Sequence, residues 1–256
     1  MQFPVYLEIG NVKLHPHLVF ELIAYIVSFR LLFYHNLQND VIPLKERSFI
    51  AIGAMFGALI GTKILVVFQY LDVYLQNPEK LQLLFVSPGK TLVGSLLGGL
   101  IGVELTKKIL AVKCSTGDAF VYPLIVGMTI GRIGCFLTGL EDGTYGLPTN
   151  LPWGIDFGDG ILRHPTQLYE IAFLIVLMVF LFVRQQYKIR QGDRFNFFMI
   201  SYLGFRLFID FIKPTFLSVL GLSSIQIACL LGLIYYFRSM PRLFEFHQHE
   251  TILKKS

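Results

Sequence analysis

Charged side chains are scarce in this chain. Asp, Glu, Lys and Arg together make up only 15% of its 256 residues, while hydrophobic residues make up 54%. Soluble globular domains average about 25% charged residues. The composition therefore argues against a soluble domain and, with a mean hydropathy of +0.60, is typical of an integral membrane protein.

Cysteine is also rare. Cys114, Cys135 and Cys229 are the three in the chain, and their spacing matches no metal-binding or redox motif. Burial as small packing residues is the simplest interpretation of each. Because Cys135 lies three residues after Arg132, on the same face of a helix, a covalent role for its thiol is the alternative.

A recognisable metal-binding loop is absent as well. The stretch "DFGDG" lacks the full ligand spacing of a calcium loop, so turn-forming and solvated roles are favoured for its acidic residues and their neighbours. We therefore expect no metal and no cofactor. The acidic residues concerned are Glu141, Asp142, Asp156 and Asp159.

The chain also lacks a low-complexity linker, a hydrophilic domain and a convincing repeat. A single integral membrane domain over residues 1–256 is the simplest architecture. The first fifteen residues have no basic start followed by an apolar core and a small-residue cleavage site, so we expect no cleavable signal peptide.

Long apolar runs are what the chain does contain. A helix needs about 20 mostly apolar residues to cross a bilayer, and seven runs of roughly that length occur. The sequence predicts an all-α membrane protein, a polytopic bundle of about seven transmembrane helices. The fourth and sixth runs each contain an arginine, and the sixth is short. The runs are 18–36, 48–70, 91–112, 119–138, 165–184, 195–212 and 222–239.

The longest connection joins spans four and five, over residues 140–165. It is rich in Gly, Pro and Asp and includes "LPWGIDFGDG". Long ordered loops are often functional, so this one is a candidate to cap a cavity.

The distribution of Lys and Arg predicts the orientation, because basic loops stay in the cytoplasm. An outside N-terminus and an inside C-terminus put 13 basic residues inside and 5 outside, which makes the 140–165 loop extracytoplasmic. The inside set is Lys45, Arg47, Lys107, Lys108, Lys113, Arg184, Lys188, Arg190, Arg194, Arg238, Arg242, Lys254 and Lys255; the outside set is Lys13, Lys80, Lys90, Arg163 and Lys213.

The net charge of +5 is explained by these cytoplasmic residues meeting anionic lipid headgroups. Membrane lipids are therefore the expected partners of the basic surface, and nucleic acid is not.

Seven ionisable residues fall inside the predicted spans. Each is a functional-site hypothesis by default, although long side chains near span ends can reach the interface. That interpretation is favoured for Arg30 and Lys63. The seven are Glu21, Arg30, Lys63, Arg132, Glu170, Arg206 and Asp210.

Arg132 and Arg206 lie in different spans of one bundle. Arginine grips phosphate with two parallel donors and stays charged, so the pair predicts a site for a phospholipid headgroup. Arg206 and Asp210 share a helical face, while Lys213 leaves an excess of positive charge there. The alternative is structural pairing of the arginines with Glu21, Glu170 or Asp210.

Small residues recur at every fourth position in two spans, at Gly53, Gly57 and Gly61 and at Gly94, Gly98 and Gly102. Close helix packing is the favoured explanation of such rows. Gly99, which follows Gly98, is a candidate to make room for a substrate.

Four stretches resemble, in order and spacing, those of the prolipoprotein diacylglyceryl transferase family. They are "LLGGLIG" at 96–102, "GRIGCFLTGLEDG" at 131–143, "RHPTQLYE" at 163–170 and "GFRLFIDFIKP" at 204–214. Seven spans and an outward N-terminus are similar to that family too.

The resemblance implies a transferase in the bacterial cytoplasmic membrane. It would move the diacylglyceryl group of phosphatidylglycerol to the cysteine thiol of a prolipoprotein lipobox and release glycerol phosphate. Arg132 and Arg206 match the two arginines of the family site, and Asp210 stands where the family usually has Glu. By the same resemblance, the other substrate-binding residues are Gly98, Gly99, Gly143, Gln167, Tyr169 and Glu170.

The chain departs from the family pattern at three places. Leu97 replaces the His of "HGGLIG", and Cys135 replaces the Asn of "GRxGN". The expected tyrosine of span one has no clear counterpart, with Phe20 and Glu21 near its place and Tyr25 a turn later. A paralogue with the same donor and another acceptor, or a non-catalytic lipid-binding or transport protein, are therefore the alternatives.

Transfer to a thiol needs a base, and two residues are candidates. His164, at the start of span five, has an imidazole suited to proton transfer, although a bond from it to the loop explains it equally well. Glu21, desolvated within the bundle, is the other candidate base, unless it serves as counter-ion to an arginine. Tyr169 has an alternative role as an interface anchor.

Overall fold

The computed structural model describes residues 3–10, 12–36, 42–77, 91–184, 190–214 and 221–237. Several basic residues used to predict the orientation lie outside these ranges. They are Lys80, Lys90, Lys188, Arg238, Arg242, Lys254 and Lys255.

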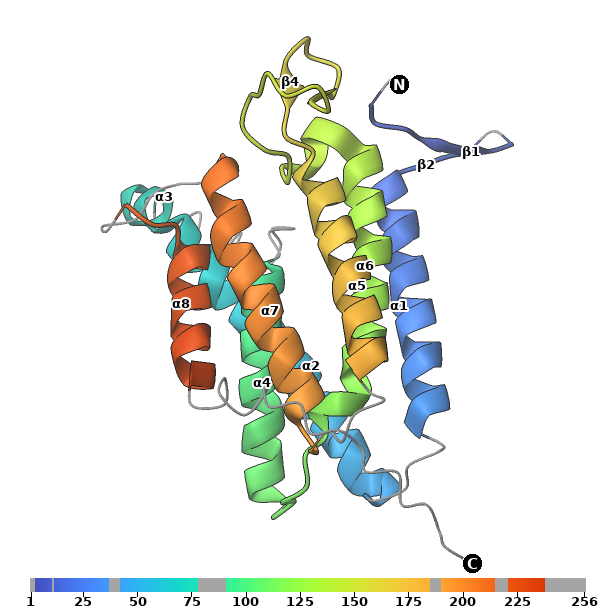
Figure 1. Cartoon of the computed structure of the whole chain (residues 1–256), viewed down its shortest axis with the longest axis vertical. Coiled ribbons are helices and arrows are strands. Elements are labelled where there is room, and N and C mark those ends of the chain that lie inside the picture. Colours follow the sequence, from blue (N-terminus) through green and yellow to red (C-terminus); the bar gives the residue numbers. More distant parts are fainter. Residues whose placement is uncertain are drawn as a thin grey trace, which may run out of the picture.

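Helices make up most of the described chain, as the composition predicts (Figure 1). Three short 3-10 turns and two small antiparallel hairpins accompany them. The α-helices are α1 (Pro16–Asn36), α2 (Leu44–Gln69), α3 (Leu71–Gln76), α4 (Leu92–Ile109), α5 (Val121–Thr138), α6 (Thr166–Arg184), α7 (Asp193–Ile209) and α8 (Ser224–Tyr236). The turns are η2 (Gly117–Phe120), η3 (Gly139–Asp142) and η4 (Asp210–Ile212), and the strands are β1 (Leu7–Ile9), β2 (Val12–Leu14), β3 (Ile155–Asp156) and β4 (Leu162–Arg163).

Five segments of the described residues are long and apolar enough to cross a membrane. They correspond to five of the seven predicted spans, including the fourth and the sixth, which contain the arginines. The segments are Pro16–Tyr34, Lys45–Gln69, Gly117–Asp142, Thr166–Arg184 and Asp193–Ile212.

The two remaining predicted spans correspond to α4 and α8, which are not among the five segments. α4 has 18 residues and ends in a charged turn with Lys107 and Lys108. α8 has 13 residues, which at 1.5 Å per residue extend for about 20 Å, less than the roughly 30 Å hydrocarbon core. The structure therefore supports an all-α membrane protein with five candidate spans, and the count of seven stays a prediction.

Apolar side chains cover much of the outer surface, and several charged side chains are buried, the reverse of a soluble protein. Large apolar side chains such as Phe29 and Ile26 are more than half exposed on the outer surface, whereas Arg132, Glu170 and Arg206 are buried. Lipid tails can cover the apolar surface, while the polar residues must satisfy one another inside. The apolar core lies mainly between α4, α5, α6, α7 and α8.

The two glycine rows meet between α2 and α4. A methyl group added at Gly57 would stand 2.3 Å from the carbonyl oxygen of Gly98, and one at Gly61 would stand 2.3 Å from that of Gly94. Only glycine lets two helix backbones approach this closely. This geometry agrees with the packing explanation of the rows.

The connection between α5 and α6 lies at the same end of the bundle as the N-terminal hairpin (Figure 1). β3 and β4 pair within it, and Asp156 accepts hydrogen bonds from the backbone N–H groups of residues 158, 159 and 160. Arg163 bonds to Asp159 at 2.6 Å and holds the pKa of that exposed carboxyl below its ordinary value. The turn-forming role predicted for these acidic residues accounts for Asp156 and Asp159.

Candidate functional site

Arg132 and Arg206 converge inside the bundle on one carboxylate. Arg132 is on α5 and Arg206 on α7, and Glu170 reaches them from α6 between the two. Nε of Arg132 lies 2.9 Å from Oε2 of Glu170, and a terminal nitrogen of Arg206 donates to the same oxygen at 3.3 Å. The two arginines therefore approach one point, as the phospholipid-site hypothesis expects, and they also pair with Glu170, as the structural alternative expects.

Three further polar groups complete this cluster. Tyr202 donates its hydroxyl to Oε1 of Glu170 at 2.8 Å. Asp210 lies 3.6 Å from Arg206, one turn further along the chain, and accepts a hydrogen bond from Ser223. These four charged side chains thus each have a partner of opposite sign, which is what low-dielectric surroundings require. The four are Arg132, Glu170, Arg206 and Asp210.

Polar atoms nevertheless remain unsatisfied here among the described residues. Gln167, one turn before Glu170 on α6, is 1% exposed, yet neither atom of its amide has a hydrogen-bond partner. Nε of Arg206 has none either, and Nε of Arg132 contacts Glu170 as an ion pair without a hydrogen bond. Buried polar groups are normally bonded, so these atoms leave capacity for a polar ligand.

A third basic side chain, that of Lys213, lies close to the cluster. Arg132, Arg206 and Lys213 face two carboxylates, those of Glu170 and Asp210. Burial, reinforced by both arginines, holds the pKa of Lys213 well below its ordinary value. An anion bound beside Lys213 would favour its protonated form.

The two candidate bases have different neighbours. Glu21 accepts a hydrogen bond from Tyr25 at 3.0 Å and lies 3.6 Å from His17. His164 contacts the hydroxyl of Tyr169 at 3.2 Å, and within the described residues it makes no hydrogen bond or ion pair with either arginine. The loop-bonding explanation therefore accounts for His164.

Tyr169 belongs to the same loop network. Its hydroxyl accepts a hydrogen bond from the indole of Trp153 at 2.7 Å. Because Trp153 is more than half exposed, this pair sits at the edge of the bundle, in keeping with the alternative role of Tyr169 as an interface anchor.

The three glycines assigned to substrate binding have different surroundings. Gly98 faces the carbonyl of Gly57 and belongs to helix packing. Gly99 lines a cavity. Gly143 follows η3 with φ +67°, in the left-handed region, and a methyl group built there would touch nothing. Its role is to let the chain turn out of η3.

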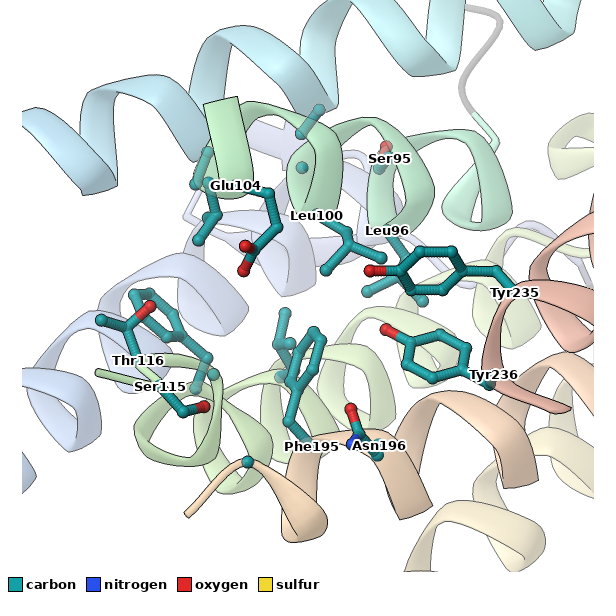
Figure 2. A pocket seen from close by; sticks show the side chains of 18 of the residues that line it. Ser95, Leu96, Leu100, Glu104, Ser115, Thr116, Phe195, Asn196, Tyr235 and Tyr236 are labelled. Carbon is teal, nitrogen blue, oxygen red and sulfur yellow. The ribbon is translucent and has the colours of Figure 1, made fainter. Parts of the chain in front are cut away.

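A cavity of about 830 Å³ opens between α4, α5, α7 and α8. Figure 2 shows Leu96, Leu100 and Glu104 of α4 facing Phe195 across it, with Tyr235 and Tyr236 closing one side. Its lining is largely apolar. Met128, one turn before Arg132 on α5, is part of the wall, so the cavity extends to within a helical turn of the arginine.

Sequence reasoning missed a second polar cluster beside Arg132. His17, at the start of α1, lies 2.9 Å from Asp142 of η3 and 3.9 Å from the sulfur of Cys135 on α5. Arg132 in turn donates to that sulfur at 3.8 Å. The only sequence signal was the pair of histidines in "LHPH" directly before the first apolar run.

Comparison with known proteins identifies the same family as the sequence motifs do. The family model described as prolipoprotein diacylglyceryl transferase matches residues 4–240. The chain belongs to this family. The match includes every residue of the arginine cluster, of the second cluster and of the cavity wall.

Relatives of this transferase family member share about a third of its residues. It is 31% identical over 235 residues to a phosphatidylglycerol–prolipoprotein diacylglyceryl transferase of Bordetella parapertussis, covering 85% of this chain and 86% of the relative. A protein of the same name from Nitrosomonas europaea is 32% identical over 69% of this chain and 63% of its own length. One from Nitratidesulfovibrio vulgaris is 34% identical over 65% and 62%.

Leu97 stands where the family pattern has histidine, and its surroundings are apolar. Its side chain lies 3.1 Å from the place a methyl group at Gly232 would take, beside Leu203. The position therefore contributes to the contact between α4 and α8, and no imidazole is available there for proton transfer.

Proposed function

We propose that this chain transfers the diacylglyceryl group of phosphatidylglycerol to the cysteine thiol of a prolipoprotein lipobox and releases glycerol phosphate. The observation that carries the proposal is the convergence of Arg132 and Arg206, from separate helices, on one point inside an apolar bundle. Family membership and the names of the relatives support the same reaction.

The arginines would act on the phosphate. In the reaction the acceptor sulfur attacks the glyceryl carbon next to the phosphate, the carbon–oxygen bond breaks, and its electron pair leaves with glycerol phosphate. Arg132 and Arg206 would stabilise the charge that develops on that oxygen, each by about 3 kcal/mol if they resemble donors of an oxyanion hole. Glu170 would hold both guanidinium groups in place until the headgroup arrives.

The remaining polar groups would orient the headgroup. The unsatisfied amide of Gln167 and the free Nε of Arg206 are suited to the hydroxyls and phosphate oxygens of phosphatidylglycerol. The apolar cavity that reaches Met128 and Gly99 would receive acyl chains below the headgroup. Binding of the headgroup would satisfy polar atoms that the protein itself leaves without partners.

The proposed placement in the membrane follows from the basic residues. We place the protein in the bacterial cytoplasmic membrane with its N-terminus and the 140–165 connection outside and its C-terminus inside, with seven spans. Lys107 and Lys108 end α4, and Arg194 begins α7, which supports a cytoplasmic location of these helix ends. The lipobox peptide would then approach from the side of β3 and β4.

A second candidate keeps the donor and changes the acceptor. The apolar surroundings of Leu97 favour it, because the imidazole of the family pattern is missing at this position. In that case glycerol phosphate would be released with another nucleophile.

Release of glycerol phosphate from labelled phosphatidylglycerol tests the proposal. The purified protein is incubated with donor vesicles, with and without a lipobox peptide. We expect release that depends on the peptide and a thioether on its cysteine. Release without any modified peptide would favour the second candidate, and no release with any acceptor would leave only lipid binding.

Substitution of the arginines tests the site itself. Arg132→Lys and Arg206→Lys should each lower the rate of release about 100-fold or more, because lysine cannot reproduce the bidentate contact. Arg30→Lys is the matched control, since Arg30 is exposed on α1, and it should leave the rate unchanged. An unchanged rate in either site variant would contradict the assignment.

A further inference from the structure

Three potential metal-ligand atoms converge at the outer end of α5. They are Nδ1 of His17, Sγ of Cys135 and Oδ1 of Asp142, and all three lie within 4.8 Å of one another. They come from the start of α1, from α5 and from η3, so their sequence separation matches no motif. Cys135 is 8% exposed, and the side chain of Asp142 is 6% exposed.

The arrangement differs from a nucleophilic triad. In a triad the nucleophile and the carboxylate bond to opposite nitrogens of the histidine. Here Cys135 and Asp142 both approach the same nitrogen of His17, at 3.9 and 2.9 Å. Atoms that share one side of an imidazole surround a common point, as the ligands of one ion do.

The donor set and spacing fit zinc. Thiolate, imidazole and carboxylate bind Zn²⁺ at about 2.0 to 2.3 Å, which in tetrahedral geometry places neighbouring donors about 3.3 to 3.6 Å apart. The distances from Nδ1 of His17 to Oδ1 of Asp142 and Sγ of Cys135 bracket that range. The third pair of donors lies within 4.8 Å, and rotations of these side chains would bring it to the same spacing.

The contacts around the donors resemble those of a metal site. Nε2 of His17, on the far side of the ring, lies 3.6 Å from Glu21, and metal-binding histidines commonly pair this nitrogen with a carboxylate. Thr144 donates to the second oxygen of Asp142. The thiolate of Cys135 and the carboxylate of Asp142 would balance the two charges of Zn²⁺. The ion would then need no charge from Glu170, which would stay paired with Arg132.

We propose that His17, Cys135 and Asp142 bind one Zn²⁺ ion and leave its fourth position for the thiol of the acceptor cysteine. The role at the acceptor rests on the transferase function proposed above, whereas zinc binding does not. Three protein ligands with one open position are typical of catalytic zinc sites.

The site would supply the deprotonated nucleophile. A thiol that coordinates zinc loses its proton, which passes to water at the outer end of the bundle. The zinc-bound sulfur then attacks the glyceryl carbon, and the broken carbon–oxygen bond leaves its electron pair on the phosphate at Arg132. Because Arg132 contacts both Cys135 and Glu170, the nucleophile and the leaving group would meet across one side chain.

Metal analysis of the purified full chain tests the binding. We expect about one zinc per chain after equilibration with Zn²⁺ and dialysis, and at least about a tenfold loss of affinity in Cys135→Ser, His17→Ala and Asp142→Asn. Cys229→Ser is the matched control, because Cys229 is a buried cysteine on α8 outside the cluster, and it should retain the zinc. Melting temperatures of all variants identify those that fold.

Two results would overturn the binding. One is a folded, unaltered chain that takes up no zinc. The other is a folded Cys135→Ser chain that retains zinc with unchanged affinity.

Cobalt substitution tests the open position. With Co²⁺ in place of zinc, the protein should show a sulfur-to-cobalt charge-transfer band, and a lipobox peptide should intensify it by adding a second thiolate. A peptide with serine in place of its cysteine should not. An unchanged band with the cysteine peptide would overturn the role at the acceptor.

The two proposals fail in different ways. If the zinc-loaded protein binds the peptide thiol but releases no glycerol phosphate, the transferase function is wrong and the metal site stands. If chelator-treated protein, shown to be free of zinc, transfers at the unaltered rate, the role of zinc is wrong and the transferase function stands.

Discussion

At the scale of single residues, Glu170 holds the arginine site together. One of its oxygens is shared by Arg132 and Arg206, and the other accepts from Tyr202. The residue is 1% exposed, so its charge depends on these partners for stabilisation. Without it, two guanidinium groups would face each other in an apolar bundle.

Glu170→Gln should therefore lower the free energy of unfolding by about 3 to 5 kcal/mol, the usual cost of breaking a buried ion pair. Denaturant unfolding in detergent measures the change. Glu104→Gln is the control: Glu104 pairs with Lys107 at an exposed position and should cost less than about 1 kcal/mol. Equal stability of the Glu170→Gln and unaltered chains would contradict the bridging role.

Gly143 allows a second prediction at this scale. Its left-handed conformation costs a residue with a side chain about 1 to 2 kcal/mol, although nothing stands where a methyl group would go. Gly143→Ala should destabilise the protein by that amount. Gly131→Ala adds a methyl group into equally open space on helix α5 and should be neutral or slightly stabilising. Similar melting temperatures of the two variants would contradict the explanation.

At the scale of elements, the α2–α4 contact depends on glycine at each crossing. A methyl group at Gly98 would lie 2.2 Å from the carbonyl oxygen of Gly57, which is backbone and can move only with its helix. At Gly99 the nearest atom is 3.5 Å away. Adjacent glycines of the same stretch thus have different tolerance to side chains.

Gly98→Ala should force α2 and α4 apart and cost about 2 kcal/mol or more, in the range of overpacked cores. Gly99→Ala should change stability by less than about 1 kcal/mol, because the added methyl group makes ordinary contacts at the cavity wall. Thermal unfolding in detergent of both variants measures the difference. The prediction fails if Gly98→Ala unfolds at the temperature of Gly99→Ala.

The elements themselves were predictable to different degrees. Apolar runs predicted the five segments that can cross a membrane, because spanning a bilayer requires a local excess of apolar residues that can be counted along the chain. α8 begins at Ser224, two residues inside its predicted span, because Ser223 and Gln226 form a capping box there, and the helix ends at Tyr236. The four-residue period of the glycines predicted a packing face, but only the structure shows that the two rows contact each other.

At the scale of the whole molecule, function requires the donor and the acceptor to approach from different directions. The arginine cluster, the cavity and the histidine–cysteine–aspartate cluster all adjoin α5. A lipid with its chains in the cavity and a peptide at the outer end of α5 would meet at Arg132. This arrangement depends on the proposed orientation in the membrane.

Labelling of introduced cysteines, with the buried Cys135 and Cys229 retained, tests that orientation. Asp159→Cys and Lys108→Cys, each in a Cys114→Ser background, place an exposed thiol at opposite ends of the bundle. In intact cells a membrane-impermeant maleimide should label only Asp159→Cys, and Lys108→Cys should react after permeabilisation. The reverse pattern would place the 140–165 connection in the cytoplasm.

The sequence alone determined that this chain is a helical membrane protein, where its long apolar helices lie, and its family, because hydropathy and motifs are local properties. Only the tertiary structure decided which polar groups meet. Arg132 pairs with Glu170 across two helices, and Cys135 meets His17 from 118 positions away along the chain. Such partners depend on the depth and rotation of each helix, which the packing of the whole bundle determines.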